Sequence, residues 1–336
     1  MRAIAALATL ALAGCATAPA MQETLVSGQT MGSAWTVKIA GPLPAASEDL
    51  RTGVQARFDA VNLALSTYRA DSALSRFNKD DSGQWVDIDV ELGEVLSYAL
   101  SLAEDSGGAY DVTVGPLVNL WGFGPDPATR QVPDRAAIDA ARARVGWRKV
   151  EVDSTKRRAR KAPGVRVDLS SLGKGRGVDR AAEYLDAQGL TNYLIDLSGK
   201  LRARGHNARA QPWRVAVEAP EADATSVRPS FKPEVVELID QSVATAGDYR
   251  RFFEIDGKHY SHIIDPRTGW PVTHATVSAS AIAADCMQAD ALATVLMAMS
   301  PDDAVALANR RQVAALLIGR DADGYLATHT GAWRLE

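Results

Sequence analysis

The chain has 336 residues and a formal net charge of −4, with 46% hydrophobic and 23% charged residues. This is ordinary globular composition, and the length supports one large domain or two smaller ones. The acidic balance argues against a general nucleic-acid-binding protein, so no nucleic-acid partner is expected. The one basic run, residues 156–161, lies between two strand-like segments and is interpreted as the solvated tip of a hairpin.

The N-terminus has the features of an export signal. Arg2 precedes an apolar run at residues 3–13, which is too short to cross a membrane as a mature helix. The L-A-G-C sequence that ends at Cys15 resembles a bacterial lipoprotein lipobox. We therefore expect a lipoprotein signal peptide at residues 1–14, lipidation of Cys15, a lipid-anchored tether at residues 15–27 and a folded domain at residues 28–336. The expected location is the bacterial cell envelope, lipid-anchored to the membrane and facing the periplasm; plain secretion after cleavage near Ala20 is the alternative.

Helices and strands then mix without a regular β-α-β alternation, which favours an α+β fold. The apolar spacing predicts helices at residues 47–65, 92–102, 136–144 and 287–299, and another that begins at residue 300. Ser47 and Ser300 are the candidate caps of the first and the last of these helices. Strands are predicted at residues 35–39, 150–152, 193–197, 213–217, 313–318 and 325–328.

The stretch at residues 165–180 reads V-R-V-D-L-S-S-L-G-K-G-R-G-V-D-R. Alternation at its start predicts a strand, the three glycines predict a loop, and a helix is expected to follow. A strand, a glycine-rich loop with a lysine and a helix bring backbone N–H groups and a cation to a phosphate. The alternative is a plain strand-to-helix turn with a solvated lysine.

Two further constellations could carry chemistry. Asp290 and Thr294 are four residues apart on a predicted helix, and their oxygens suit a hard cation such as Mg²⁺. A hydrogen bond along the helix face is the alternative interpretation. His262 opens the H-I-I-D-P-R-T-G turn, where a histidine can act as a general base or simply be hydrogen-bonded.

Together these segments resemble the ApbE-type FAD:protein FMN transferases, from about Gly28 to the C-terminus. The motifs that carry the resemblance are T-M-G at 30–32, S-T-Y-R-A-D-S-A-L-S-R-F-N at 66–78, G-G-A-Y-D-V-T-V-G-P-L-V-N-L-W-G-F-G at 107–124, D-L-S-S-L-G-K-G at 168–175, A-T-A-G-D-Y at 244–249, H-I-I-D-P-R-T-G at 262–269 and A-D-A-L-A-T at 289–294. The chain departs from the family pattern by small-for-small changes at Ser171, Ser198 and Ala246.

The resemblance implies a T-fold-like α+β architecture with mixed, largely antiparallel sheets packed against helices. It implies that residues 28–336 form an Mg²⁺-dependent enzyme that transfers FMN from FAD to a threonine or serine hydroxyl of an acceptor protein and releases AMP. The expected acceptors are flavoproteins of membrane redox complexes. The alternatives are an Mg²⁺-dependent FAD pyrophosphatase that yields FMN and AMP, or a non-catalytic FAD-binding lipoprotein.

The same resemblance assigns roles to individual residues. The residues expected to contact FAD are Met31, Tyr68, Ala109, Tyr110, Asp111, Asp168, Lys174 and Ile264. Mg²⁺ is expected on the side chains of Asp290 and Thr294 and on the carbonyl oxygen of Ser171. His262 is the candidate proton acceptor, with Asp248 and Asp265 as rivals.

Overall fold

The computed structural model describes residues 21–124, 131–217, 233–248, 252–321, 324–331 and 333. Its helices are α1 (Ser47–Leu65), α2 (Ala73–Lys79), α3 (Val90–Asp105), α4 (Gly115–Leu120), α5 (Arg135–Arg142), α6 (Ser170–Ala187), α7 (Cys286–Ala298) and α8 (Pro301–Arg310). Its strands are β1 (Glu23–Thr30), β2 (Ser33–Ala40), β3 (Val86–Asp87), β4 (Val150–Asp153), β5 (Arg158–Lys161), β6 (Tyr193–Leu197), β7 (Lys200–Arg204), β8 (Trp213–Ala216), β9 (Val235–Leu238), β10 (Ser242–Gly247), β11 (Phe252–Ile255), β12 (Lys258–Ser261), β13 (Thr276–Ala283), β14 (Ala314–Asp321) and β15 (Gly324–Thr330).

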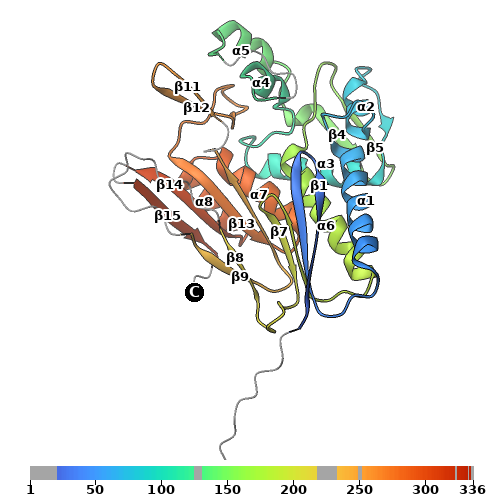
Figure 1. Ribbon diagram of the computed structural model, residues 1–336. Coiled ribbons are helices and arrows are strands. Elements are labelled where there is room, and N and C mark those ends of the chain that lie inside the picture. Colours follow the sequence, from blue (N-terminus) through green and yellow to red (C-terminus); the bar gives the residue numbers. More distant parts are fainter. Residues whose placement is uncertain are drawn as a thin grey trace, which may run out of the picture.

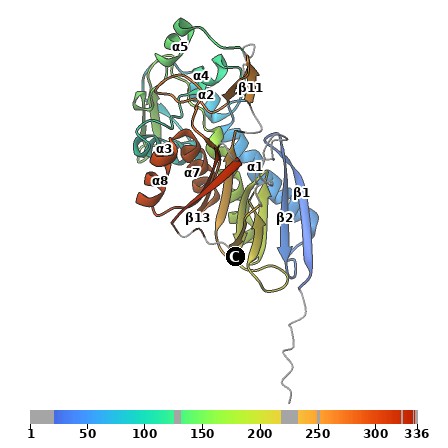
Figure 2. The ribbon, with the colours of Figure 1, turned by 90° about the vertical axis from the view of Figure 1, so that its left-hand side faces the viewer.

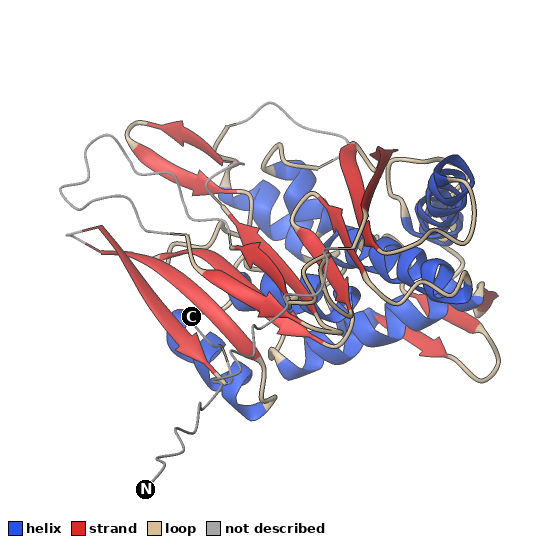
Figure 3. Ribbon diagram, turned by 60° about the horizontal axis from the view of Figure 1, so that its bottom comes forward, coloured by secondary structure: helices blue, strands red, loops and turns tan. Residues whose placement is uncertain are grey.

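One large sheet organises the molecule (Figure 1). Its strand order is β1-β2-β6-β7-β10-β13-β14-β15, and every neighbouring pair is antiparallel. Helices α1, α6 and α7 pack against one face of the sheet, and the β8–β9 pair packs against part of the other. Figures 2 and 3 show the large sheet with helices packed beside it. This arrangement confirms the predicted α+β fold with largely antiparallel sheets.

The alternation of side chains along β2 shows how the sequence fixes the two faces of the sheet. Trp35, Val37 and Ile39 are fully buried in a cluster with side chains of α1 and α6. Thr36 and Lys38, between them, point to the opposite face because successive side chains of a strand alternate. Burying each large apolar side chain contributes roughly 1.5–3 kcal/mol. A register shift of one residue would forfeit that contribution, so the pattern holds β2 in place.

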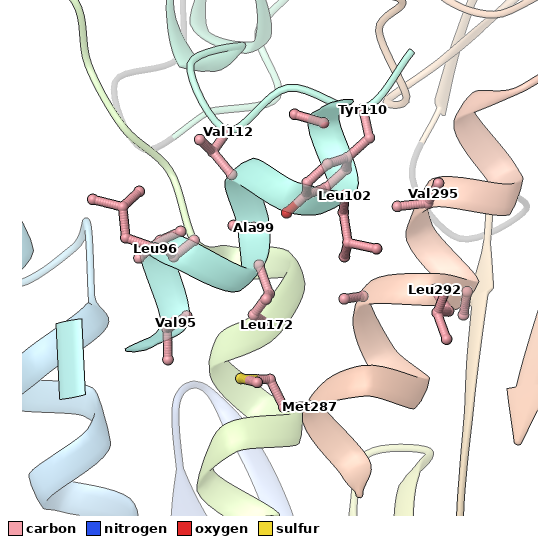
Figure 4. Packing of buried hydrophobic residues seen from close by; sticks show 14 of the residues in the cluster. Val95, Leu96, Ala99, Leu102, Tyr110, Val112, Leu172, Met287, Leu292 and Val295 are labelled. Carbon is pink, nitrogen blue, oxygen red and sulfur yellow. The ribbon is translucent and has the colours of Figure 1, made fainter. Parts of the chain in front are cut away.

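A second apolar cluster joins α3, α6 and α7 (Figure 4). Leu102 of α3, Leu172 of α6 and Leu292 of α7 are among its buried members. The cluster therefore fixes the first turns of α6 beside α7.

The start of α3 is capped by a side chain. The Asp89 carboxylate accepts a hydrogen bond from Leu92 N at 2.7 Å, which satisfies one of the N–H groups that have no partner within the helix.

The glycine-rich stretch is helical, which corrects the predicted loop. Residues 165–169 form no strand, and α6 begins at Ser170 and runs through all three glycines. A Cβ atom on Gly175 would lie 2.4 Å from the carbonyl oxygen of Cys286, and one on Gly177 would lie 2.9 Å from the ring of Phe58. These two glycines therefore let α6 approach α7 and α1 closely, and they are not needed for a turn.

Several other elements differ from the sequence prediction. Strand β1 begins at Glu23, so the folded region starts upstream of residue 28, where we expected it to begin. Helix α1 has Ala46 at its cap position and no side-chain cap, so the predicted role of Ser47 is wrong. Ser300 does cap α8, accepting a hydrogen bond from Asp303 N. The β4–β5 hairpin exists, but four of the six residues of the basic run lie in β5, and Lys161 is buried rather than solvated.

Candidate functional site

A cavity of about 770 Å³ opens where the N-terminus of α6, the middle of α7 and the ends of β6, β7 and β10 meet. The residues predicted for the site that line this cavity are Tyr68, Ala109, Tyr110, Asp111, Asp168, Ser171, Lys174, His262, Ile264, Asp290 and Thr294. These residues come from segments more than two hundred positions apart in the chain. The fold thus brings most of the predicted site together in one place.

The start of α6 presents polar groups to the cavity. Asp168 lies two residues before α6 begins, and its carboxylate accepts a hydrogen bond from the N–H of Ser170, the first residue of the helix, at 2.8 Å. Lys174 follows one turn later, and its ammonium group donates to Ser33 Oγ at 2.9 Å in the β1–β2 hairpin. Three N–H groups of this first turn already have acceptors within the chain: Ser170 N donates to Asp168, and Leu172 N and Gly173 N donate to the carbonyl oxygen of Leu169. The partial positive charge of the helix start and the Lys174 ammonium group are the features that favour an anion here.

Asp290 lies on α7 and is almost completely buried. Its Oδ2 atom accepts a hydrogen bond from Gly175 N at 3.1 Å, and its Oδ1 atom is 2.9 Å from Lys200 Nζ. Thr294, one turn further along α7, donates its hydroxyl hydrogen to the carbonyl oxygen of Asp290 at 3.1 Å. The carboxylate and the hydroxyl therefore share one wall of the cavity, as their four-residue spacing predicts.

Ser171 and Tyr110 are joined across the cavity wall. Their hydroxyl oxygens are 2.8 Å apart, and the Tyr110 side chain is buried. Burial raises the pKa of the Tyr110 phenol, so the group stays neutral and can act as a hydrogen-bond donor. This contact ties the segment after α3 to the start of α6.

Asp111 lines the cavity, but its carboxylate is hydrogen-bonded to groups of the protein itself. Oδ1 accepts hydrogen bonds from the N–H of Thr113 at 2.8 Å and from the Thr113 hydroxyl at 2.6 Å, and Oδ2 accepts one from Trp147 N at 2.7 Å. Burial raises the pKa of Asp111, while these hydrogen bonds act in the opposite direction. Its principal role in the structure is to shape the loop that carries Ala109 and Tyr110.

His262 reaches the cavity from the turn that follows β12. Its ring meets the ring of Phe123 edge-on, with 6.2 Å between centroids. The turn is closed by Asp265 N, which donates to the carbonyl oxygen of Trp270 at 2.9 Å, and by a bridge between Ile264 and Pro271. This hairpin holds His262 and Ile264 at the cavity wall.

Three predicted site residues do not line the cavity. Met31 sits at the tip of the β1–β2 hairpin with a φ of 47° and packs against the two apolar clusters. The Asp265 carboxylate is held by Arg267, with Nε 3.0 Å from Oδ1. The Asp248 carboxylate faces His259, whose Nε2 lies 3.7 Å from Oδ2. Met31, Asp248 and Asp265 therefore lie outside the cavity wall, although residues adjacent to Asp248 and Asp265 in the chain form part of it.

Sequence reasoning missed Lys200, which is the first residue of β7. Its ammonium group donates to the carbonyl oxygen of Thr245 at 2.6 Å and contacts Asp290. The sequence feature that could have indicated Lys200 is the D-L-S-G turn at residues 196–199. This turn directly precedes Lys200 and forms part of the cavity wall. The positive φ values of Ser198 and Gly199, 53° and 81°, mark that turn as tight and aim the next residue into the site.

The donor set around Asp290 suits a hard cation. Asp290 supplies a carboxylate, Thr294 a hydroxyl group and Thr245 a carbonyl oxygen. The Lys200 ammonium group, which is itself a cation, already lies between the Asp290 carboxylate and the Thr245 carbonyl oxygen. Mg²⁺ is commonly held by one or two carboxylates together with substrate phosphates and water. Within the described residues no cluster of three or more histidine, cysteine, aspartate or glutamate side chains could hold a metal by itself. A metal here would depend on oxygens from a substrate.

The comparisons with known proteins agree with this geometry. A profile described as the ApbE family matches residues 31–317. The FAD:protein FMN transferase of Vibrio cholerae serotype O1 is 42% identical over 96% of this chain and 94% of that protein, and the one of Escherichia coli K12 is 35% identical over 95% and 92%. The solved structure titled Flavin Transferase ApbE from Vibrio cholerae has a TM-score of 0.85 at 39% identity and covers 93% of this chain and 98% of its own. The apo flavinyl transferase ApbE of Pseudomonas stutzeri has a TM-score of 0.84 at 36% identity, covering 93% and 95%. A family match over most of the chain, together with relatives and folds of this similarity, shows that this chain belongs to the ApbE family.

Proposed function

We propose that the chain is an FAD:protein FMN transferase, which moves FMN from FAD to a threonine or serine hydroxyl of an acceptor protein and releases AMP. One observation carries the proposal. The cavity joins an anion-favouring helix terminus, two lysines and a buried carboxylate on one side to a histidine on the other. The names of the relatives, FAD:protein FMN transferase, support the same reaction.

The reaction is a phosphoryl-group transfer. The acceptor oxygen forms a bond to the phosphorus on the FMN side of the pyrophosphate, and the bond from that phosphorus to the bridging oxygen breaks. The hydroxyl proton passes to a base, and AMP leaves with the bridging oxygen. Such reactions depend mainly on positioning and on neutralising charge.

The chain's own residues can meet both requirements. Lys174 and the positively polarised start of α6 would bind the pyrophosphate and stabilise the charge that develops on AMP. Tyr68, Ala109, Tyr110, Asp168 and Ile264 are the wall residues proposed to contact FAD. Asp290, Thr294 and the Ser171 carbonyl oxygen would hold Mg²⁺, which when bound neutralises pyrophosphate charge and polarises the phosphorus.

His262 is the preferred proton acceptor. It lines the cavity, whereas the carboxylates of Asp248 and Asp265 face His259 and Arg267 outside the cavity wall. A neutral imidazole can accept the proton of an attacking hydroxyl group as a general base.

The test is to incubate the purified chain with FAD and Mg²⁺, with and without the flavin-bearing subunit of a membrane redox complex, and to identify the products. Flavin covalently attached to that subunit, with one AMP per flavin, supports the proposal. Free FMN and AMP would instead indicate a pyrophosphatase, and unchanged FAD would indicate a non-catalytic carrier. Asp290→Ala should abolish the product, and omission of divalent metal should do the same.

We also propose that the mature chain is anchored to the membrane of a bacterial cell envelope through Cys15 and faces the periplasm. Cys15 and the signal sequence lie outside the described residues, so the proposal rests on the L-A-G-C sequence. Across the described part of the chain, no helix has the length and apolarity to cross a membrane. Attachment would thus depend on the lipid, and the acceptors would be flavoproteins of membrane redox complexes.

A further inference from the structure

Lys200 forms a shielded ion pair with the carboxylate proposed to bind the metal. Its ammonium group lies 2.9 Å from Asp290 Oδ1, and the two side chains are only 13% and 4% exposed. Charges at this depth are screened little by salt, so the pair persists at physiological ionic strength. The carbonyl oxygen of Thr245 accepts a second hydrogen bond from the same ammonium group, at 2.6 Å.

The sheet register determines this position. Lys200 lies opposite Ala244 in the β7–β10 pair, and the neighbouring Leu201 packs on the β8–β9 face. Because side chains alternate along a strand, Lys200 must point to the helix face, where α7 carries Asp290. The ammonium group therefore reaches Asp290 from a rigid strand and not from a loop.

Both oxygens of the Asp290 carboxylate are engaged. Lys200 contacts Oδ1, and the backbone N–H of Gly175 donates to Oδ2 at 3.1 Å. A divalent cation that approached Asp290 in the flavin-free protein would be repelled by the ammonium group and would have to displace a charge-assisted hydrogen bond.

We propose that Lys200 is a positioning residue that makes metal binding depend on FAD. It holds the Asp290 carboxylate in place and lowers the affinity of the flavin-free protein for divalent cations. When the pyrophosphate enters, its negative charge attracts the ammonium group, whose flexible stem lets it turn from Asp290 toward a phosphate oxygen. The Asp290 oxygen that Lys200 releases would then be available to a divalent cation, together with the phosphate oxygens. This inference rests on the proposed use of a divalent cation at Asp290.

The experiment uses Mn²⁺ as the probe and follows the electron paramagnetic resonance signal of the free ion during titration of the purified chain without flavin. The parent should bind Mn²⁺ weakly. Lys200→Gln, which removes the charge, should bind it roughly ten- to a hundredfold more tightly, the range expected from the net strength of a charged hydrogen bond. Lys200→Arg keeps the charge and should bind as weakly as the parent.

A second titration, with saturating FAD, tests the coupling. FAD should increase the Mn²⁺ affinity of the parent by a larger factor than that of Lys200→Gln, because the glutamine variant has no ion pair to break. Equal affinities of the parent and Lys200→Gln in the absence of flavin would overturn the inference, as would weaker binding by the variant. Asp290→Asn in the Lys200→Gln background should abolish the tight site; if it does not, Mn²⁺ binds elsewhere and the inference is wrong.

The Mn²⁺ titrations and the test of the proposed function give results that can be distinguished from each other. Thermal unfolding establishes that each variant is folded, and Lys200→Met provides a second neutral variant if glutamine destabilises the chain. Covalent transfer of FMN is measured in a separate assay. Transfer without the expected Mn²⁺ differences overturns only the role of Lys200, and the Mn²⁺ differences without transfer overturn only the transferase proposal.

Discussion

The carboxylate of Asp179 on α6 accepts a hydrogen bond from the backbone N–H of Cys286, the first residue of α7, at 2.8 Å. Its other oxygen accepts one from Met287 N at 2.8 Å, and Arg202 contacts the same carboxylate at 2.7 Å. One helix thus caps the start of the next, and the capped helix carries Asp290 one turn later. The position of the proposed metal ligand depends on a residue that does not line the cavity.

Asp179→Ala should lower the free energy of unfolding by about 3–5 kcal/mol, because it leaves a partly buried guanidinium and two buried backbone N–H groups unpaired. Denaturant unfolding measures the loss. Glu183→Ala on the same helix is the control, since Glu183 is exposed and its pairing with Arg180 is expected to contribute about 0–1 kcal/mol. Equal losses for the two variants would contradict the capping role.

Gly175→Ala should destabilise the protein by about 1–3 kcal/mol, the usual cost of overpacking. The added Cβ atom would lie 2.4 Å from the carbonyl oxygen of Cys286, so α6 and α7 must separate. Gly173→Ala, two residues earlier in the same helix, meets nothing within 4 Å and should stabilise by roughly 0.5–1 kcal/mol through helix propensity. Thermal and denaturant unfolding of the two variants measures the change in the free energy of unfolding for each. If both variants were destabilised equally, the cause would be backbone conformation and not the contact between α6 and α7.

His262→Ala should reduce single-turnover FMN transfer roughly 10²- to 10⁴-fold while leaving FAD affinity much less affected. The reason is that His262 is the titratable side chain proposed to take the hydroxyl proton. Asp265→Asn is the matched control from the same turn, because its carboxylate is bound to Arg267. Intact transfer by His262→Ala would remove the histidine from the mechanism and turn attention to Asp248 or Asp265.

Cys15→Ser should release the chain from the membrane fraction or block its processing, because the hydroxyl group cannot carry the thioether-linked lipid. Fractionation and the electrophoretic mobility of the mature chain measure the effect. A variant that fractionates and migrates like the parent would exclude the lipid anchor.

The free energy of unfolding should fall as the pH drops below about 6.5, in part through His274. Burial lowers the pKa of the His274 imidazole, and a smaller interaction with the Met297 backbone acts in the opposite direction. The unfolded chain therefore binds a proton at a higher pH than the folded chain, so stability is lost as pH falls from the unfolded pKa toward the folded one. In denaturant titrations at pH 5 to 7, His274→Leu should reduce the dependence of the free energy of unfolding on pH. An unchanged pH dependence would show that other groups cause it.

The sequence predicted the amphipathic helices well, because their signal is local. The positions Leu50, Val54 and Phe58 recur at helical spacing, and all three are buried on α1. Strands β7, β10 and β13 escaped prediction because they are short or rich in serine and alanine, which have little intrinsic preference for strands. Their pairing in the large sheet, and not their own composition, makes them strands.

Site residues that belong to a sequence motif could be predicted, and those whose position depends on contacts between distant segments could not. Asp290 and Thr294 of one motif and His262 and Ile264 of another line the cavity, whereas Asp265 of the second motif does not. The role of Gly175 was misread because the approach of the α7 backbone is invisible in the sequence. The pairing of Lys200 with Asp290 depends on the register of β7 against β10, which no local pattern encodes.

The cavity wall combines Tyr68, Lys174, His262 and Asp290, which lie far apart along the chain. No continuous fragment shorter than about two-thirds of the protein contains them all, so the binding surface arises only when distant segments have met. A ligand of the cavity contacts segments from both halves of the chain, so it should raise the melting temperature of the whole protein in a single cooperative transition.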